Sequence, residues 1–159
     1  MNGLQFNPEN ASSGLGRVPM EEQYVYRDAQ WIDVIPVPDL SQRQVQAIKR
    51  LIEVLSLSEN WDSYGSPPPN LNSVDVAIIL LTKIDLDDIP IPHIVPVSGG
   101  GIQLEWSAAA RELELEISHD GLVQYMKTEH GEPLEEGPTE SVAHARSLLT
   151  WLIPNAPIA

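Results

Sequence analysis

The feature that most constrains this fold is a strict alternation of apolar and polar residues in two neighbouring segments, 102–106 and 111–117. Successive side chains of a β-strand point to opposite faces, so the alternation predicts two strands that share one apolar face. That face would carry Ile102, Leu104, Trp106, Leu113, Leu115 and Ile117. The opposite face would carry Gln103, Glu105, Glu112, Glu114 and Glu116.

The four glutamates Glu105, Glu112, Glu114 and Glu116 are the first candidate for a binding site. Glutamate is depleted in strands, and like charges on adjacent strands repel each other. Folding stability alone therefore does not explain four glutamates with no lysine between them. We interpret this face either as a merely solvated surface or as the surface that binds a partner.

The turn after the second strand decides how a third strand would pair. A two-residue turn would leave Val123 and Tyr125 among the glutamates. A three-residue turn over 119–121, with its glycine in the left-handed region, instead pairs Ile117 with Val123 and Leu115 with Tyr125. We predict this second turn, because a slip of one residue would turn every apolar side chain to the other face.

A helix is predicted to begin at Asp39 or Ser41 and to run to about residue 57. Ser41 and Gln44 have the spacing of a capping box. The residues that recur at helical intervals are Val45, Ile48, Leu51, Ile52 and Leu55, and we expect them to face the core.

Two further helices are predicted over 73–83, capped by Asn72 or Ser73, and over 139–152. The first of these is rich in β-branched residues, which leaves a strand as the alternative. A further strand is expected over 93–97. The predicted fold class is therefore α+β, with an antiparallel sheet of three to four strands and two to three helices packed on one face.

The chain of 159 residues, 42% of them apolar, can bury one core. We expect a single α+β domain over 39–155. Residues 1–38 are expected to form a flexible leader followed by an extended arm rich in aromatic residues and proline, which includes Trp31. The arm would pack on its own domain or, alternatively, dock on a partner through its aromatic side chains.

The charge of the chain favours a basic protein as its partner. Nine basic and 23 acidic residues give a net charge of −14, and 13 acids against two bases between positions 85 and 140 contribute −11 of it. Such a field repels nucleic acids and anionic membranes. The absence of cysteine, of a long apolar run and of a signal-peptide pattern predicts a cytoplasmic protein.

A loop between the first two predicted helices carries Trp61, Asp62 and Tyr64 among glycine and proline residues. An aromatic pair with an aspartate on such a loop is one candidate recognition surface. In the alternative interpretation Trp61 fills the core, Asp62 binds loop amides, and Gly65 adopts a positive φ.

Here the sequence resembles a family of small bacterial proteins without an established activity. The resemblance rests on the loop Asn-Trp-Asp-Ser-Tyr-Gly at 60–65, a later Pro-x-Ile/Val-x-Pro element, a Gly-Gly-Ile-x-Leu-Glu-Trp strand and an Asp-Gly turn. It covers positions 60–125, about two-fifths of the chain. It implies a prokaryotic origin and brings no reaction, cofactor or site residue with it.

Catalytic and metal sites find little support in the sequence. The four histidines lack the spacing of a zinc motif. Glu105 could face Glu112 or Glu114 as an acid–base pair, but such a pair needs a cleft that separates the two pKa values. The glycines at 99–101 precede a strand, so they form no phosphate site at a helix N-terminus. We expect no catalytic residue, no metal and no cofactor.

The leading hypothesis is a non-enzymatic acidic protein that inhibits, neutralises or regulates a basic protein, as an antitoxin, immunity protein or inhibitor does. Its glutamate face could imitate a nucleic acid. A chaperone or an accessory subunit of a larger complex is the second hypothesis, and a small enzyme is the third. The candidate partner-binding residues are Glu105, Glu112, Glu114, Glu116, Trp31, Trp61, Asp62 and Tyr64.

Overall fold

The computed structural model describes residues 24–27, 30–33, 39–84 and 88–153. The chain divides into two compact units, residues 1–37 and residues 38–159. In the first unit, β1 (Tyr24–Arg27) and β2 (Gln30–Asp33) pair with each other as antiparallel strands within the predicted arm. The predicted leader before β1 lies outside the described residues.

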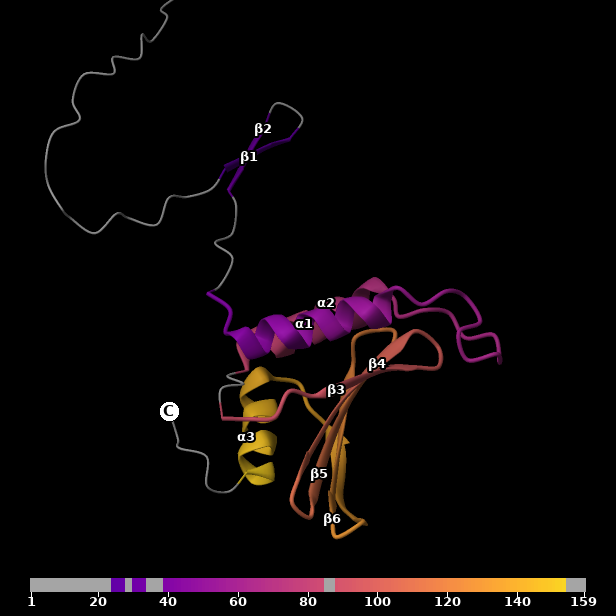
Figure 1. Ribbon diagram of the computed structural model, residues 1–159, viewed down its shortest axis with the longest axis vertical. Coiled ribbons are helices and arrows are strands. Elements are labelled where there is room, and N and C mark those ends of the chain that lie inside the picture. Colours follow the sequence, from indigo (N-terminus) through magenta and orange to yellow (C-terminus); the bar gives the residue numbers. More distant parts are fainter. Residues whose placement is uncertain (1–23, 28–29, 34–38, 85–87, 154–159) are drawn as a thin grey trace, which may run out of the picture. The chain divides into compact units, whose positions relative to one another are not determined.

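The second unit is an α+β domain built on one antiparallel sheet with the strand order β3-β4-β5-β6-β7. Figure 1 shows α3 along one face of this sheet, and α1 and α2 side by side at the end of the sheet. The predicted fold class is confirmed, with five strands in place of three to four. The elements are α1 (Gln42–Leu55), α2 (Leu71–Lys83), β3 (His93–Val97), β4 (Gly101–Ala108), β5 (Arg111–Ile117), β6 (Val123–Glu129), β7 (Glu132–Pro138) and α3 (Val142–Leu152).

Strand β7, which pairs with β6 at the edge of the sheet, was not predicted from the sequence. Its residues do not alternate between apolar and polar, and nearly all of them are exposed. Pro133 and Pro138 also disfavour a strand, because proline has no amide hydrogen to donate to a neighbouring strand. An edge strand tolerates proline, because one side of its backbone has no neighbour to bond.

The turn between β5 and β6 has the predicted form. Ile117 pairs with Val123 and Leu115 pairs with Tyr125. The amide of Gly121 donates to the carbonyl of Ser118 at 2.9 Å, and Gly121 has a φ of +84°. This positive φ suits glycine, which has no Cβ to clash in the left-handed region. The register of the third strand is therefore confirmed.

One core lies between the sheet and the helices. The alternating apolar residues of β4 and β5 are all buried, as predicted, and Leu104 lies opposite Leu115. Helical residues complete this core from α1, α2 and α3. The largest fully buried side chains are Leu51, Leu81, Ile84, Ile102, Leu104, Leu113, Leu115, Ile117, Leu149, Leu152 and Pro92.

Helix α1 has the predicted capping box, but its core-facing stripe is shifted by one position. The Ser41 and Gln44 side chains each accept a hydrogen bond from the other's amide. Gln44 is buried, and its Nε2 donates to the carbonyls of Thr82 and Ile84 at 3.0 and 3.1 Å. A glutamine that binds the end of α2 thus takes a core position, and the predicted core residues Val45 and Ile52 are exposed.

Helices α2 and α3 begin two to three residues away from the predicted positions. Helix α2 starts earlier, because Asn70 and not Asn72 or Ser73 is its N-cap, and Asn70 Oδ1 accepts from the Ser73 amide at 3.0 Å. Helix α3 starts later, at the N-cap Ser141. The alternative of a strand over 73–83 is wrong, since burial against the sheet outweighs the low helix propensity of the β-branched residues.

Trp106→Ala should lower the free energy of unfolding by about 3–5 kcal/mol, the usual loss for a buried aromatic side chain, because Trp106 is only 2% exposed. Glu114→Ala on the other face should cost less than about 0.5 kcal/mol. Trp106→Phe should cost less than the alanine change, since the buried indole Nε1 has no acceptor among the described residues. Urea denaturation measures all three, and equal small losses for Trp106→Ala and Glu114→Ala would contradict the assigned faces.

Candidate protein-interaction surface

The sheet face opposite the helices brings the four predicted glutamates together. The register of β4 and β5 places Glu105 directly opposite Glu114, and Gln103 opposite Glu116. Glu112 lies two residues before Glu114 and therefore on the same face. All of these side chains are half-buried or exposed. Alternation alone predicted this grouping, and the strand pairing turns it into a continuous surface.

A fifth carboxylate joins this surface from β7. Glu114 lies opposite Met126, and Met126 lies opposite Glu136 on the edge strand. The sequence did not predict the position of Glu136, because the residues of β7 lack the alternation of a strand. We call the set Glu105, Glu112, Glu114, Glu116 and Glu136 the acidic face.

Glu114 lies at the centre of the acidic face and experiences its crowding most. Partial burial of its carboxyl group, followed by repulsion from Glu105, Glu112 and Glu116, raises the pKa of Glu114. Both causes disfavour the ionised form. The ionised Glu114 carboxylate therefore destabilises the folded domain, and a cationic partner would offset this destabilisation.

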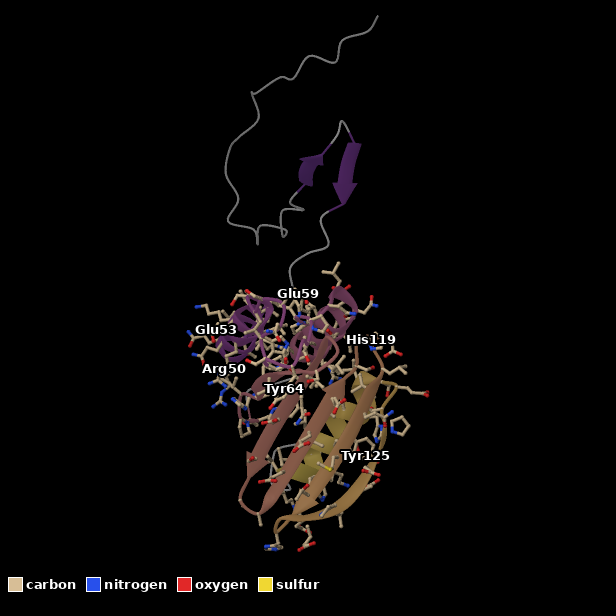
Figure 2. All side chains as sticks on the ribbon, turned by 90° about the vertical axis from the view of Figure 1, so that its right-hand side faces the viewer. Arg50, Glu53, Glu59, Tyr64, His119 and Tyr125 are labelled. Atoms are coloured by element: carbon tan, nitrogen blue, oxygen red, sulfur yellow. The ribbon has the colours of Figure 1, made fainter. Side chains whose placement is uncertain are left out.

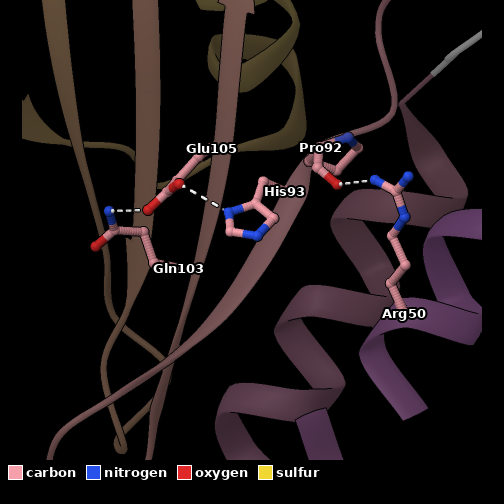
Figure 3. A network of polar contacts seen from close by, with 5 residues as sticks. All are labelled: Arg50, Pro92, His93, Gln103 and Glu105. Carbon is pink, nitrogen blue, oxygen red and sulfur yellow. Dashed lines mark hydrogen bonds and ion pairs between the residues drawn. The ribbon is translucent and has the colours of Figure 1, made fainter. Parts of the chain in front are cut away.

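Glu105 is held in place by its two neighbours on the same face (Figure 3). Its Oε1 accepts a hydrogen bond from Gln103 Nε2 at 3.0 Å, and its Oε2 lies 3.1 Å from Nδ1 of His93 on β3. His93 lies opposite Glu105 in the β3–β4 pairing. The sequence predicted no role for His93. The pairing of β3 with β4 places His93 beside the acidic face.

The arginine and the lysine of the sheet lie on its other side. Arg111 and Lys127 are the two bases in the five strands, and the pairing of Lys127 with the buried Leu113 places it on the helix-covered side. Lys127 Nζ lies 2.6 Å from Glu135 and 4.6 Å from the centre of the Trp151 ring. Arg111 binds Glu129 at 2.7 Å. Neither base therefore neutralises the acidic face.

The loop between α1 and α2 is organised around Asp62. Its Oδ1 accepts hydrogen bonds from the amides of Tyr64 and Ser66 at 2.9 and 3.1 Å. Its Oδ2 accepts from the hydroxyls of Ser66 and Ser98 at 2.5 and 3.2 Å. The hydroxyl of Ser66, followed by the Tyr64 amide, lowers the pKa of Asp62 to about 2. Asp62 thus binds loop amides, as one interpretation of the sequence proposed, and ties the loop to the β3–β4 turn.

The same loop presents Tyr64 to solvent. Tyr64 is 93% exposed, although the Asp62 carboxylate fixes its amide. Trp61 is only half-buried and its Nε1 donates to the carbonyl of Pro67 at 3.0 Å, so the idea that Trp61 fills the core is wrong. Figure 1 shows this loop extending past the sheet on the side away from α3, and Figure 2 labels Tyr64 above the strands. Gly65 has the positive φ expected of it, +89°.

Trp31, the remaining predicted site residue, belongs to the other unit. It lies in β2, where its backbone pairs with Tyr26. Its side chain lies outside the described part of the molecule. The structure therefore brings Glu105, Glu112, Glu114 and Glu116 together on one face, places Asp62 and Tyr64 on an adjoining loop, and leaves the role of Trp31 a prediction.

The chemistry available to this surface is the binding of cations by carboxylates. A row of ionised carboxylates accepts short, charge-assisted hydrogen bonds from guanidinium and ammonium groups. Glu105 and Glu114 face each other on the open side of the sheet. A catalytic acid–base pair instead needs a cleft that separates the two pKa values. Within 39–84 and 88–153, no three side chains of His, Cys, Asp or Glu gather in a way that could hold a metal ion.

Comparisons with protein-family models, with curated proteins and with solved structures find no match for this chain. The resemblance to small bacterial proteins thus stays a prediction. Among the described residues, no helix has both the length and the apolar character that crossing a membrane requires.

Glu114→Gln should raise the melting temperature at pH 7, and the gain should disappear toward pH 4. A pKa raised by folding means that the charged carboxylate destabilises the folded state, whereas the protonated group does not. The penalty is therefore absent below the pKa of an unfolded glutamate, about 4.3. Thermal unfolding between pH 4 and pH 8 measures it, with Glu132→Gln as the exposed control. An equal gain at both ends of this range would contradict the assigned crowding.

Asp62→Ala should increase hydrogen exchange at the amides of Tyr64 and Ser66, because both lose their carboxylate acceptor. In the unchanged protein this protection should persist well below pH 3.8 and fall only near the lowered pKa of about 2. Exchange measured residue by residue by NMR tests both statements. Asp120→Ala, in the β5–β6 turn, is the matched control and should leave the two amides protected. Unchanged exchange in Asp62→Ala would refute the role assigned to this carboxylate.

Proposed function

We propose that this protein is a non-enzymatic, acidic binding module that inhibits, neutralises or regulates a basic protein partner. An antitoxin, an immunity protein or an inhibitor of a bacterial enzyme works in this way. The observation that carries the proposal is the acidic face, five carboxylates on the open side of a five-stranded sheet.

The carboxylates of the acidic face destabilise the folded domain, and this supports a role in binding. Glu105 and Glu114 lie directly opposite each other, where like charges repel. Partial burial, followed by repulsion from Glu105, Glu112 and Glu116, raises the pKa of Glu114. Lysine at one of these positions would relieve the repulsion, yet the two bases of the sheet lie on the helix-covered side. A basic partner would supply the missing opposite charge and would be attracted from a distance.

Imitation of a nucleic acid is one form that this function can take. Glu112, Glu114 and Glu116 project at two-residue intervals from a single strand, which makes a regular row of negative charge. Proteins that bind nucleic acids present lysine and arginine to a comparable row of phosphates. The acidic face would then occupy such a groove and block it.

The second candidate function is that of a chaperone or accessory subunit of a larger complex, and exposed apolar residues favour it. Large apolar side chains stay in contact with solvent on the helices, the loops and the edge strand β7 of the domain. They include Tyr64, Leu71, Ile52, Ile79, Leu122 and Leu134. A partner held mainly through these residues would depend little on the carboxylates.

The variant E105Q/E112Q/E114Q/E116Q separates the two functions. The basic partner is first captured from the native host and identified by mass spectrometry. At low salt the variant should associate with this partner at least about tenfold more slowly than the unchanged protein, because electrostatic steering acts on the association rate. Most of the salt dependence should also disappear, since screening acts over about 8–10 Å. Stopped-flow or surface plasmon resonance at two salt concentrations gives both quantities.

A second quadruple variant, D39N/E53Q/E59Q/E132Q, is the matched control, because it removes four charges from exposed positions off the acidic face. It should bind with nearly the association rate of the unchanged protein. Unchanged rates and an unchanged salt slope in the first variant would reject the acidic face as the interface and favour the accessory-subunit function.

A further inference from the structure

A groove of about 580 Å³ lies beside the acidic face and contains none of its five carboxylates. Helix α2 forms one wall, and the β5–β6 turn with the start of β6 forms the other. The end of β7 and the start of α3 close it. Its lining includes Val76, Ile79, Leu122, Val123, Gln124 and Val142.

The groove offers apolar side chains that remain in contact with solvent. Ile79 is 49% exposed and Leu122 is 63% exposed, although both are large aliphatic residues. Val76, Val123 and Val142 are half-buried behind them. Apolar surface that is concave and open to solvent is typical of a binding site, since a partner can remove it from water.

The walls of the groove are held together before any partner arrives. Asn70, the N-cap of α2, also donates from its Nδ2 to the carbonyl of His119 in the β5–β6 turn at 2.6 Å. Gly121 in that turn lies so close to Val76 that an added Cβ would be 3.4 Å from its methyl carbon. Because the turn is pinned to α2, the groove needs little reorganisation to accept a side chain.

The groove adjoins the acidic face at Gln124. A second hollow, of about 420 Å³, is lined by Glu114, Glu116 and Glu136 of the acidic face and by Gln124. Gln124 also lines the groove. An apolar site and a row of carboxylates therefore meet at one residue of β6.

We infer that the groove receives apolar side chains of the basic partner itself, so that the partner presents an amphipathic, cationic segment. This inference rests on the proposed function. The carboxylates would attract the segment and orient it, and burial of its apolar side chains in the groove would supply most of the affinity. A second copy of this chain is a poor occupant, because two chains of charge −14 repel each other.

Two synthetic peptides of 14 residues test the inference without knowledge of the partner. One is an amphipathic helix of leucine and lysine, and the other has serine in place of every leucine with the lysines unchanged. Fluorescence anisotropy should give the leucine peptide an affinity at least about tenfold higher, the expected gain from burying one or two leucine side chains. The amide signals of Val76 and Val142 should shift with the leucine peptide and not with the serine peptide.

The variant I79S/L122S should reduce that preference to less than threefold and leave the binding of the serine peptide unchanged. Both residues are largely exposed, so the domain should stay folded, which its thermal unfolding will verify. The matched control is V45S/I52S on α1, which replaces two apolar residues of similar exposure, 39% and 58%, outside the groove. It should keep the full preference for the leucine peptide.

The outcomes distinguish failure of the groove from failure of the acidic face. If I79S/L122S keeps the leucine preference, or if V45S/I52S loses it equally, the groove assignment is wrong while binding of the serine peptide still supports the acidic face. If the serine peptide fails to bind, or binds E105Q/E112Q/E114Q/E116Q as well as the unchanged protein, the proposed function is wrong. A leucine preference that only I79S/L122S abolishes would then still support the groove.

Discussion

Burial of the alternating apolar side chains of β4 and β5 is the constraint on which the rest of this domain depends. Leu104 and Leu115 face each other across the two strands and are fully buried. Since side chains of a strand alternate between faces, burial of these leucines places Glu105 and Glu114 on the open side of the sheet. The hydrophobic core and the acidic face are two consequences of one register. A slip by one residue would exchange them, and the large free energy of apolar burial forbids it.

A few polar side chains fix the segments around this sheet, and each of them bonds to backbone. Gln44 caps the end of α2 with two hydrogen bonds, Asn70 joins the start of α2 to the β5–β6 turn, and Asp62 collects the amides of its own loop. These contacts restrain the backbone near the exposed Tyr64 and Leu122. A surface that is already restrained loses less entropy when it binds.

The proposed interface combines two kinds of interaction that act at different stages of binding. Charge on the acidic face acts over long range and speeds the encounter, but exposed ion pairs add little affinity. Apolar burial in the groove acts only on contact and slows dissociation. Gln124 lines both the groove and the hollow beside the acidic face, so the two interactions meet there. Arg111 and Lys127 form their ion pairs on the helix-covered side, which leaves the charge of the acidic face available to a partner.

Local pattern in the sequence was enough to determine the α+β class, the faces of β4 and β5, the turn before β6 and the grouping of four glutamates. All of these follow from residues close in the chain, whose period or turn chemistry acts locally. Tertiary structure decided the rest. Gln44 takes a core position that its neighbour Val45 was predicted to hold, because it binds carbonyls 38 and 40 residues away. Strand β7, with no apolar pattern, exists because β6 offers it backbone hydrogen bonds, and it carries Glu136 onto the acidic face. The groove likewise arises where α2, β6 and α3 meet, a juxtaposition that only the packed core creates.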